Sequence, residues 1–255
     1  MLNARGIEFK VGNKVLLEAT SISFEANKFH VIMGSNGAGK TTLLRLLAGN
    51  TRPYQGEIIL FDRSLDQYSN KELATRRAVL SQHYQITFPI NVSDIVMMGR
   101  YPYYGNNPAK KDVAICKQAM QLMQVDEMAE RDYNTLSGGE MQKVQMSRVL
   151  AQIWETDSEQ KILFLDEPVS HLDMKYQHQL LQVAKDLCKK NVTVIAILHD
   201  INLALAFADR IIFMKSGAVV RDINNVKEIN TALIKDVFDV QSRVIEVDGN
   251  PIVVF

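Results

Sequence analysis

A glycine-rich segment at residues 34–42 fits the pattern G-x-x-x-x-G-K-[ST]. Its residues are Gly34, Ser35, Asn36, Gly37, Ala38, Gly39, Lys40, Thr41 and Thr42. An apolar run (31–33) precedes it and a leucine-rich, helix-forming stretch (43–48) follows, which is the strand–loop–helix context of a nucleotide-binding P-loop. The backbone N–H groups of such a loop and the positive end of the helix form a concave site for phosphate oxygens. We predict that the segment binds a nucleoside triphosphate, with Lys40 reaching the β- and γ-phosphates and the Thr41 hydroxyl as a Mg²⁺ ligand.

Two adjacent acids, Asp166 and Glu167, follow a second apolar run at residues 162–165. Ligands of a parallel sheet bind at the carboxyl ends of its strands, so we expect both acids beside the P-loop phosphates. Asp166 is predicted to hold Mg²⁺, directly or through water. Glu167 projects differently and is predicted to orient or deprotonate the attacking water. The alternative is that the two acids only end a strand at the solvent.

A second helix start that suits an anion lies at residues 136–140, with the sequence Leu-Ser-Gly-Gly-Glu. Ser137 is placed to begin the helix, and Gly138 and Gly139 leave backbone N–H groups uncovered. Taken alone, the segment reads as an ordinary helix cap. One triphosphate does not need two phosphate-binding helix starts in one chain, which suggests that the second start serves another nucleotide.

With these segments in this order, the chain resembles the ATP-binding cassette family over essentially its whole length. The resemblance implies two cassettes in a head-to-tail homodimer, with each ATP held between one P-loop and the partner's Leu-Ser-Gly-Gly-Glu signature. Ser137, Gly138 and Gly139 then contact the γ-phosphate bound by the other subunit. The resemblance also implies ATP hydrolysis with Mg²⁺ as the cofactor.

Three further positions match the family's motifs. Gln82 matches the Q-loop glutamine, which senses Mg²⁺ and the attacking water and counts here among the predicted metal and catalytic residues. His199 matches the switch histidine that contacts the γ-phosphate. Residues 170–173 match the D-loop, which places Asp173 at the dimer interface near the nucleotide. In isolation, Gln82 reads as a surface residue and His199 as a histidine at a strand end.

Two positions depart from the family's pattern. The aromatic residue on which adenine stacks is replaced by Val11, with Phe9 two positions earlier. Base–aromatic stacking is worth about 1–3 kcal/mol in nucleic-acid systems, so its loss predicts weaker nucleotide affinity or looser base selectivity. Residues 169–171 read Val-Ser-His where Thr-Ser-Ala is commoner, which we interpret as tuning of the dimer interface.

Residues 88–92 and 98–102 resemble importers of iron-siderophores, heme and vitamin B12, in which this region docks on the permease. Residues 148–154, 198–204 and 208–211 look most like hemin importer ATPases, and residues 177–179 fit them too. The implied partners are two transmembrane permease subunits and, indirectly, a periplasmic substrate-binding protein. Ferric siderophore or cobalamin remain alternative cargoes. A soluble cassette ATPase acting on DNA or the ribosome and a non-hydrolysing regulatory module are the rival classes.

Composition limits the classes of function. The formal net charge of the 255 residues is zero and no long basic block is present, which disfavours nucleic acid as a partner. Two distant cysteines do not make a disulfide framework. No apolar run reaches the length of a membrane span, and the N-terminus lacks the core of a signal peptide. From composition we expect a soluble, cytosolic chain in which any membrane role is borrowed from a partner. The resemblance to the importers then implies a peripheral protein on the cytoplasmic face of a bacterial inner membrane.

The elements that must position these residues follow from periodicity. Residues 5–33, 57–61, 78–81, 161–165 and 192–198 read as strands, and the period becomes helical from Pro89 to about Gln152. The predicted fold class is therefore α/β. It has a P-loop NTPase (RecA-like) core, an N-terminal antiparallel β subdomain and an inserted all-helical subdomain. We expect one ATPase domain over 1–255, with the core at 1–88 and 153–255 and the helical subdomain, signature included, at 89–152. Residues 155–160 are predicted to form a polar loop, and the tail 231–255 a helix and a hairpin that serve either the dimer interface or the core.

Overall fold

The computed structural model describes residues 1–82, 86–155 and 159–255. Residues 83–85 follow Gln82 directly, and residues 156–158 belong to the predicted polar loop 155–160. The expectations for those two short stretches therefore lie outside the described residues.

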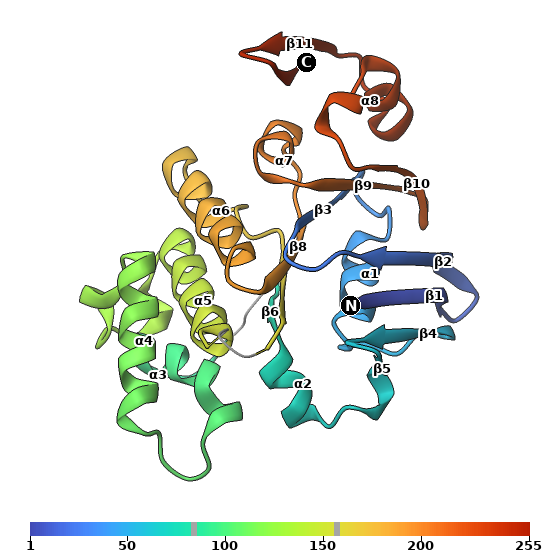
Figure 1. Ribbon diagram of the computed structural model, residues 1–255. Helices are drawn as coiled ribbons and strands as arrows, with labels where there is room; N and C mark the ends of the chain where they lie inside the picture. Colours follow the sequence, from blue (N-terminus) through green and yellow to red (C-terminus); the bar gives the residue numbers. More distant parts are fainter. Residues whose placement is uncertain (83–85, 156–158) are drawn as a thin grey trace.

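A six-stranded sheet forms the centre of the molecule (Figure 1). In spatial order, its strands are β10 (Ala218–Ile223), β9 (Arg210–Lys215), β3 (Phe29–Gly34), β8 (Val192–Ile197), β7 (Lys161–Asp166) and β6 (Arg77–Leu80). Strand β10 pairs antiparallel with β9, whereas the other pairings are parallel. Every residue of β3, β7 and β8 is buried, as their apolar runs predict for parallel strands covered on both faces.

A second, antiparallel sheet is built from the N-terminal segment. Its strands are, in spatial order, β2 (Lys14–Phe24), β1 (Leu2–Val11), β4 (Gln55–Leu60) and β5 (Arg63–Ser64). Helix α1 (Lys40–Leu47) lies between the two sheets, because Leu43 and Leu46 share one hydrophobic cluster with Leu17 of β2 and Phe164 of β7. The predicted combination of a P-loop core and an antiparallel N-terminal part is confirmed.

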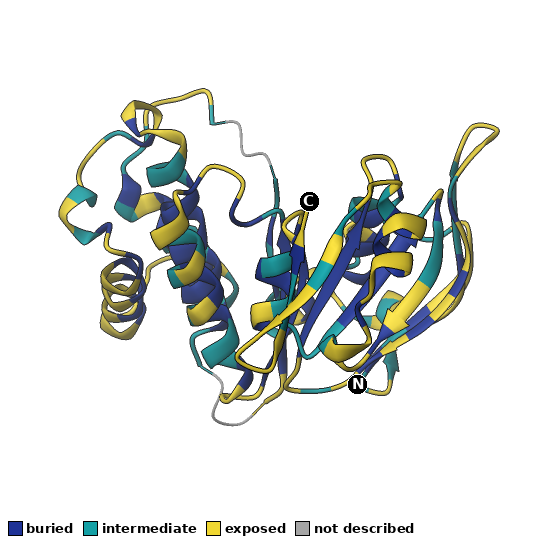
Figure 2. Cartoon of the chain, turned by 90° about the horizontal axis from the view of Figure 1, so that it is seen from above, coloured by how far each residue is buried: buried dark blue, intermediate teal, exposed yellow. Residues whose placement is uncertain are grey.

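The helices lie mainly on the other face of the parallel sheet. They are α3 (Val92–Met97), the 3₁₀ helix η2 (Met98–Tyr103), α4 (Lys110–Met123), α5 (Gly138–Ile153), α6 (Met174–Cys188) and α7 (Ile201–Phe207). The first four form a separate arm beside the sheet, and Figure 2 shows their buried sides turned towards one another. Within the described ranges, none of the helices combines the length and the apolar character that crossing a bilayer requires.

Helix α2 (Asn70–Arg76) is absent from the predicted elements. A capping box starts it, since Ser69 Oγ accepts from the Glu72 N–H and the Glu72 carboxylate accepts from the Ser69 N–H. The Ser-x-x-Glu spacing was readable in the sequence. The remaining short 3₁₀ turns are η1 (Leu65–Gln67), η3 (Asp126–Met128), η4 (Tyr133–Thr135) and η5 (Val226–Glu228).

The C-terminal tail forms helix α8 (Thr231–Phe238) and the hairpin β11 (Arg243–Val247) and β12 (Asn250–Val254). Asp248 and Gly249 both have positive φ, 51° and 78°, as a tight hairpin turn requires. The side chain of Asn202 on α7 bonds both main-chain groups of Val253, at 3.0 and 2.9 Å, and Val253 is buried. These contacts place β12 on the core of its own chain, which is one of the two alternatives for the tail.

Candidate active site at the carboxyl ends of the parallel strands

The P-loop encloses a pocket of about 220 Å³ between β3 and α1. Its lining comprises Leu16, residues 36–42 and Glu167. The loop can close tightly only with glycine at its ends. Gly34 has φ 147°, and a Cβ there would lie 2.1 Å from the carbonyl oxygen of Met214; at Gly39, φ is 95° and the corresponding distance, to Leu16 O, is 2.8 Å.

Lys40 begins α1 and points back into its own loop. Its Nζ donates to the carbonyl oxygens of Gly34 and Ser35, both at 2.9 Å, and the residue is only 5% exposed. Burial lowers the pKa of the ammonium group, while the carboxylates of Glu167 and Asp166 act in the opposite direction. The cation is therefore held over the pocket by two carbonyl groups that phosphate oxygens can replace.

Asp166 ends β7 within reach of Thr41. The Thr41 hydroxyl donates to Asp166 Oδ1 at 3.2 Å, and Asp166 is 2% exposed. Burial raises the pKa of Asp166 and the charge of Glu167 adds to the rise, whereas the bond from Thr41 and the charges of Arg45 and Lys40 oppose it. A cation bound here would relieve the cost of the buried carboxylate.

The oxygen-rich donor set at this point fits Mg²⁺. A hydroxyl and a carboxylate face each other, and Mg²⁺ is commonly held by one or two such groups together with substrate phosphates. No group of three or more His, Cys, Asp and Glu side chains suited to a metal is found in the part of the chain that the structure describes.

Glu167 is held between Gln82 and His199. Gln82 Nε2 donates to Glu167 Oε2 at 2.7 Å, and His199 Nε2 lies 2.7 Å from Glu167 Oε1. The three residues follow β6, β7 and β8, adjacent parallel strands whose carboxyl ends meet at one edge of the sheet. Glu167 has φ 53°, in the left-handed region that non-glycine residues avoid. The backbone thus turns the carboxylate away from the line of β7 and towards its two partners.

The signature residues do not line this pocket. Ser137 caps α5, where its Oγ accepts from Glu140 N–H at 3.3 Å and donates to Glu140 Oε2 at 2.7 Å. Residues 171 and 172 of the same chain lie beside Gly138 and Gly139, of which Gly138 is exposed and Gly139 half-buried. Asp173 caps α6, accepting from the Tyr176 N–H at 3.0 Å. Within a single chain, residues 137–140 therefore form a helix cap. None of residues 136–140 is among the described residues that line the P-loop pocket.

The structure shows the surroundings of two positions that depart from the family's pattern. Val11 stands 59% exposed at the tip of β1 and is not part of the pocket lining; Leu16, on the following strand, is. His171 lies against the signature glycines, although its sequence position indicated only a departure at the interface. The sequence marked both positions as departures from the family's pattern, but their surroundings depend on how a loop packs on a distant element.

The segment with the importer-like motif is partly turned inward. Tyr101 is 57% exposed and Phe88 56% exposed. The Tyr103 hydroxyl donates to Gln152 O at 2.6 Å and accepts from Lys161 Nζ at 3.0 Å, so its polar end is held within its own chain. Of these tyrosines, Tyr101 remains the side chain best placed for a partner.

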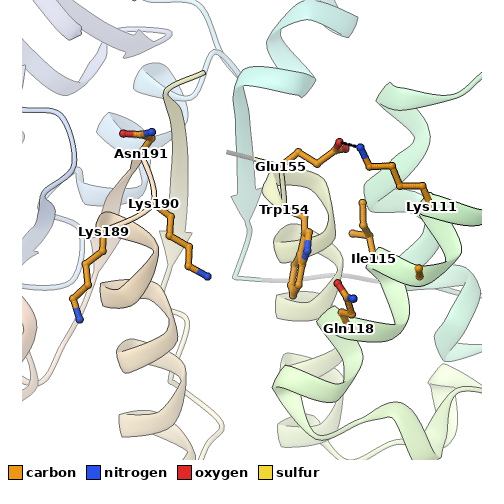
Figure 3. A pocket seen from close by; sticks show the side chains of 9 residues that line it. Lys111, Ile115, Gln118, Trp154, Glu155, Lys189, Lys190 and Asn191 are labelled. Carbon is orange, nitrogen blue, oxygen red and sulfur yellow. Dashed lines mark hydrogen bonds and ion pairs between the residues drawn. The ribbon is translucent and has the colours of Figure 1, made fainter. Parts of the chain in front are cut away.

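A larger hollow, of about 780 Å³, lies away from the P-loop, between α4 and the ends of α5 and α6 (Figure 3). Lys190 points across it towards Trp154 and Gln118, and Glu155 pairs with Lys111 on α4. Two helix C-termini border it, and their partial negative charge attracts lysines and disfavours phosphate. Among the described residues that line the hollow there is no glycine-rich helix start like that of residues 34–42.

Comparison with known proteins agrees with this geometry. The family model for the ABC transporter matches residues 17–170. The hemin import ATP-binding protein HmuV of Rhodopseudomonas palustris (strain HaA2) is 42% identical over 255 residues, covering 99% of this chain and 96% of the relative. A protein of the same name from Escherichia coli O157:H7 is 39% identical, covering 86% of this chain and 85% of its own.

Among solved structures, the ATP-binding cassette MJ0796, in a dimeric post-hydrolysis state bound to ADP and phosphate, superposes with a TM-score of 0.77. That match has 24% identity and covers 88% of this chain and 98% of the other. An inward-facing ABC transporter described as of the metal-chelate type gives a TM-score of 0.81 at 23% identity, covering 99% and 96%. These two likenesses support the fold, and the family model together with the sequence relatives carries the assignment: the chain belongs to the ABC transporter family.

Proposed function

We propose that this chain is the ATP-hydrolysing subunit of an importer that carries hemin across a bacterial inner membrane. The observation that carries the proposal is the grouping of Gln82, Glu167 and His199 beside the P-loop pocket of a chain whose full-length relatives are hemin import ATP-binding proteins. The cargo rests on those relatives' names, while the ATPase role rests also on the site.

The residues of the pocket divide the chemistry as follows. Backbone N–H groups of residues 34–42 and the Lys40 ammonium bind the β- and γ-phosphates. Thr41, Asp166 and the Gln82 amide oxygen would hold Mg²⁺, which would supply positive charge to offset the charge of the phosphates. Glu167 orients the attacking water and accepts its proton, and His199 fixes the Glu167 carboxylate and contacts the γ-phosphate.

A head-to-tail homodimer supplies the other half of each pocket. Ser137 caps α5 and Gly138 and Gly139 start it, so the N–H groups of the two glycines and the helix dipole form a seat for the γ-phosphate bound by the partner. Ser137 contacts the same phosphate, and Asp173 lies at the same interface. ATP bridges two chains whereas ADP does not reach both. This difference in affinity for the closed dimer is what lets ATP binding and hydrolysis drive a conformational cycle.

The arm of α3, η2, α4 and α5 is proposed as the helical subdomain, residues 89–152, on the core of 1–88 and 153–255. Exposed Phe88 and Tyr101 suit contact with a permease, because aromatic side chains are enriched in interfaces. Two permease subunits would hold the dimer at the cytoplasmic face of the membrane, and a periplasmic hemin-binding protein would act only through them. The zero net charge gives no support to a nucleic-acid partner.

The test uses the Glu167→Gln variant, which keeps the size of the side chain and removes the proton acceptor. With ATP and Mg²⁺ it is expected to accumulate as a dimer in sedimentation experiments and to hydrolyse ATP at least 100-fold more slowly, since a general base contributes roughly 10²–10⁴-fold. The exposed Glu130→Gln variant is the matched control and should behave as the native chain. Normal hydrolysis by Glu167→Gln, or no ATP-dependent dimer, would refute the role of Glu167.

The cargo is tested with the permease in proteoliposomes. ATP hydrolysis and uptake should be stimulated by a hemin-loaded binding protein, but not by one loaded with ferric siderophore or cobalamin. Stimulation by either of the latter alone would overturn the hemin assignment and leave the ATPase role intact.

A further inference from the structure

Residues 168–173, which lead from Glu167 to α6, lie along the first turns of α5. Gln142 on α5 donates to the carbonyl oxygen of Pro168 at 2.8 Å, and Gln177 on α6 donates to that of Leu172 at 2.9 Å. The segment is thus fastened on both sides, and His171 projects from a backbone whose position is fixed.

His171 lies where the signature begins. Its Cβ, Cγ and Cδ2 atoms are 3.8–3.9 Å from the point that a Cβ on Gly138 would occupy, and its carbonyl oxygen is 3.2 Å from the corresponding point at Gly139. Gly139 therefore makes room for this loop, whereas a Cβ at Gly138 would meet the His171 side chain only at ordinary van der Waals distance. As a result, the imidazole ring stands at the side of the α5 N-terminus.

The ring is oriented by its neighbour Ser170. His171 Nδ1 is 3.0 Å from Ser170 Oγ, whose hydroxyl also lies 3.2 Å from the carbonyl oxygen of Glu167. The Ser170 hydroxyl has one proton: donated to the Glu167 carbonyl oxygen, it leaves Oγ to accept from Nδ1–H, whereas donated to Nδ1 it leaves the ring's own proton on Nε2, the form that can donate outward. His171 is exposed, and Nε2 has no partner within the described residues.

We propose that His171 is a further nucleotide-binding residue, whose Nε2–H donates to a phosphate oxygen of the ATP held by the partner's P-loop. This inference rests on the head-to-tail dimer of the proposed function, which brings that triphosphate to the start of α5. Ser170 acts as the positioning residue that turns Nε2 outward.

A phosphate at the start of α5 would be stabilised by one more hydrogen-bond donor. In the free chain the Ser137 hydroxyl is engaged by Glu140, whose carboxylate also accepts from the Ser137 N–H at 2.7 Å. The Ser137 bonds hold the pKa of Glu140 below its ordinary value, so the side chain is anionic, and Arg131 lies 3.7 Å from it. A phosphate that binds at this turn is therefore repelled by the Glu140 carboxylate and finds the Ser137 hydroxyl already bonded. The imidazole N–H offsets both, because a hydrogen bond to a charged oxygen is stronger than a neutral one.

The experiment measures the dimer dissociation constant in the Glu167→Gln background with saturating ATP and Mg²⁺, by sedimentation. His171→Gln places an N–H near the Nε2 position, whereas His171→Asn reaches only the Nδ1 position and His171→Leu keeps the bulk without a donor. Each dimer contains two such contacts, each worth about tenfold or more. We expect the dissociation constant to rise roughly 100-fold in His171→Asn and His171→Leu, and by less than about threefold in His171→Gln.

The affinity of the monomer for a fluorescent ATP analogue and the thermal unfolding midpoint should stay unchanged in all three variants, since the contact exists only across the dimer. If the parent dimerises and His171→Asn and His171→Leu dimerise equally well, the inference is overturned and the proposed function stands. Weakened nucleotide binding by monomeric variants would also overturn it, because the ring would then act within its own chain. A parent that stays monomeric with ATP would refute the dimer itself.

Discussion

Arg100 is the largest fully buried side chain of the protein's described part, and its removal is expected to cost more stability than any exposed charge. Its Nε donates to Asp112 at 2.9 Å, Nη1 to the carbonyl oxygen of Ala151 at 2.9 Å and Nη2 to Glu155 at 2.5 Å. The guanidinium carbon is 3.9 Å from the centre of the Tyr103 ring. The side chain thus ties η2 to α4 and to the end of α5, the helix that begins with the signature.

The Arg100→Ala variant leaves Asp112 buried without its cation, because both side chains of the pair are nearly inaccessible, at 2% and 7% exposure. Breaking a buried pair by removing one partner costs about 3–5 kcal/mol. For a chain of this size the melting temperature changes by about 2–4 °C per kcal/mol, so we expect a fall of roughly 6–20 °C. Arg52→Ala is the matched control, since the Arg52–Asp66 pair is 85% and 70% exposed and such pairs contribute about 0–1 kcal/mol.

Equilibrium unfolding in urea measures both variants, and the single tryptophan, Trp154, reports on it from beside Glu155. The double variant Arg100→Ala/Asp112→Ala should lose less than the sum of the single variants, since coupled partners deviate from additivity by about 0.5–3 kcal/mol. A loss below about 1 kcal/mol for Arg100→Ala, or an equal loss for Arg52→Ala, would refute the reasoning.

Three further outcomes are expected. Gly34→Ala should lower the free energy of unfolding by about 2–5 kcal/mol, because its Cβ would lie 2.1 Å from the Met214 carbonyl oxygen at a positive φ. Gly105→Ala, where a Cβ would enter open space, should change the free energy of unfolding by less than about 0.5 kcal/mol. Burial lowers the pKa of Lys161 to about 8 from 10.5, so the unfolded chain binds more protons between these values and stability should rise with pH across that window. In urea titrations at pH 8 and 10.5, the Lys161→Met variant should lack this rise in stability. A rise as large as that of the native chain would contradict the assignment to Lys161. Burial also lowers the pKa of His30 below 6.5, so stability should fall as the pH drops below about 6.5; His30→Leu should fall less, and an equal fall would exclude His30 as the cause.

The sequence by itself was sufficient for the local elements and for the identity of the motifs. Apolar runs mark the buried strands β7 and β8, the glycines of residues 34–39 mark the P-loop, and Asp166 and Glu167 follow a strand where a parallel sheet binds its ligands. Each of these signals lies within a few residues, where side-chain periodicity and backbone sterics act directly. The Ser69–Glu72 capping box is a signal of the same local kind, and it indicates the start of α2, a helix that periodicity alone does not predict.

Only the tertiary structure decided which distant residues meet. Glu167 contacts Gln82 and His199 because β6, β7 and β8 are neighbours in the sheet, an order that no single segment encodes. Packing of long-range elements likewise buried Arg100 and turned Tyr103 inward. The same packing places His171 beside Gly138 and Gly139. Periodicity determines which side of an element is apolar, whereas the choice of the surface that covers it depends on the whole chain folding around one core.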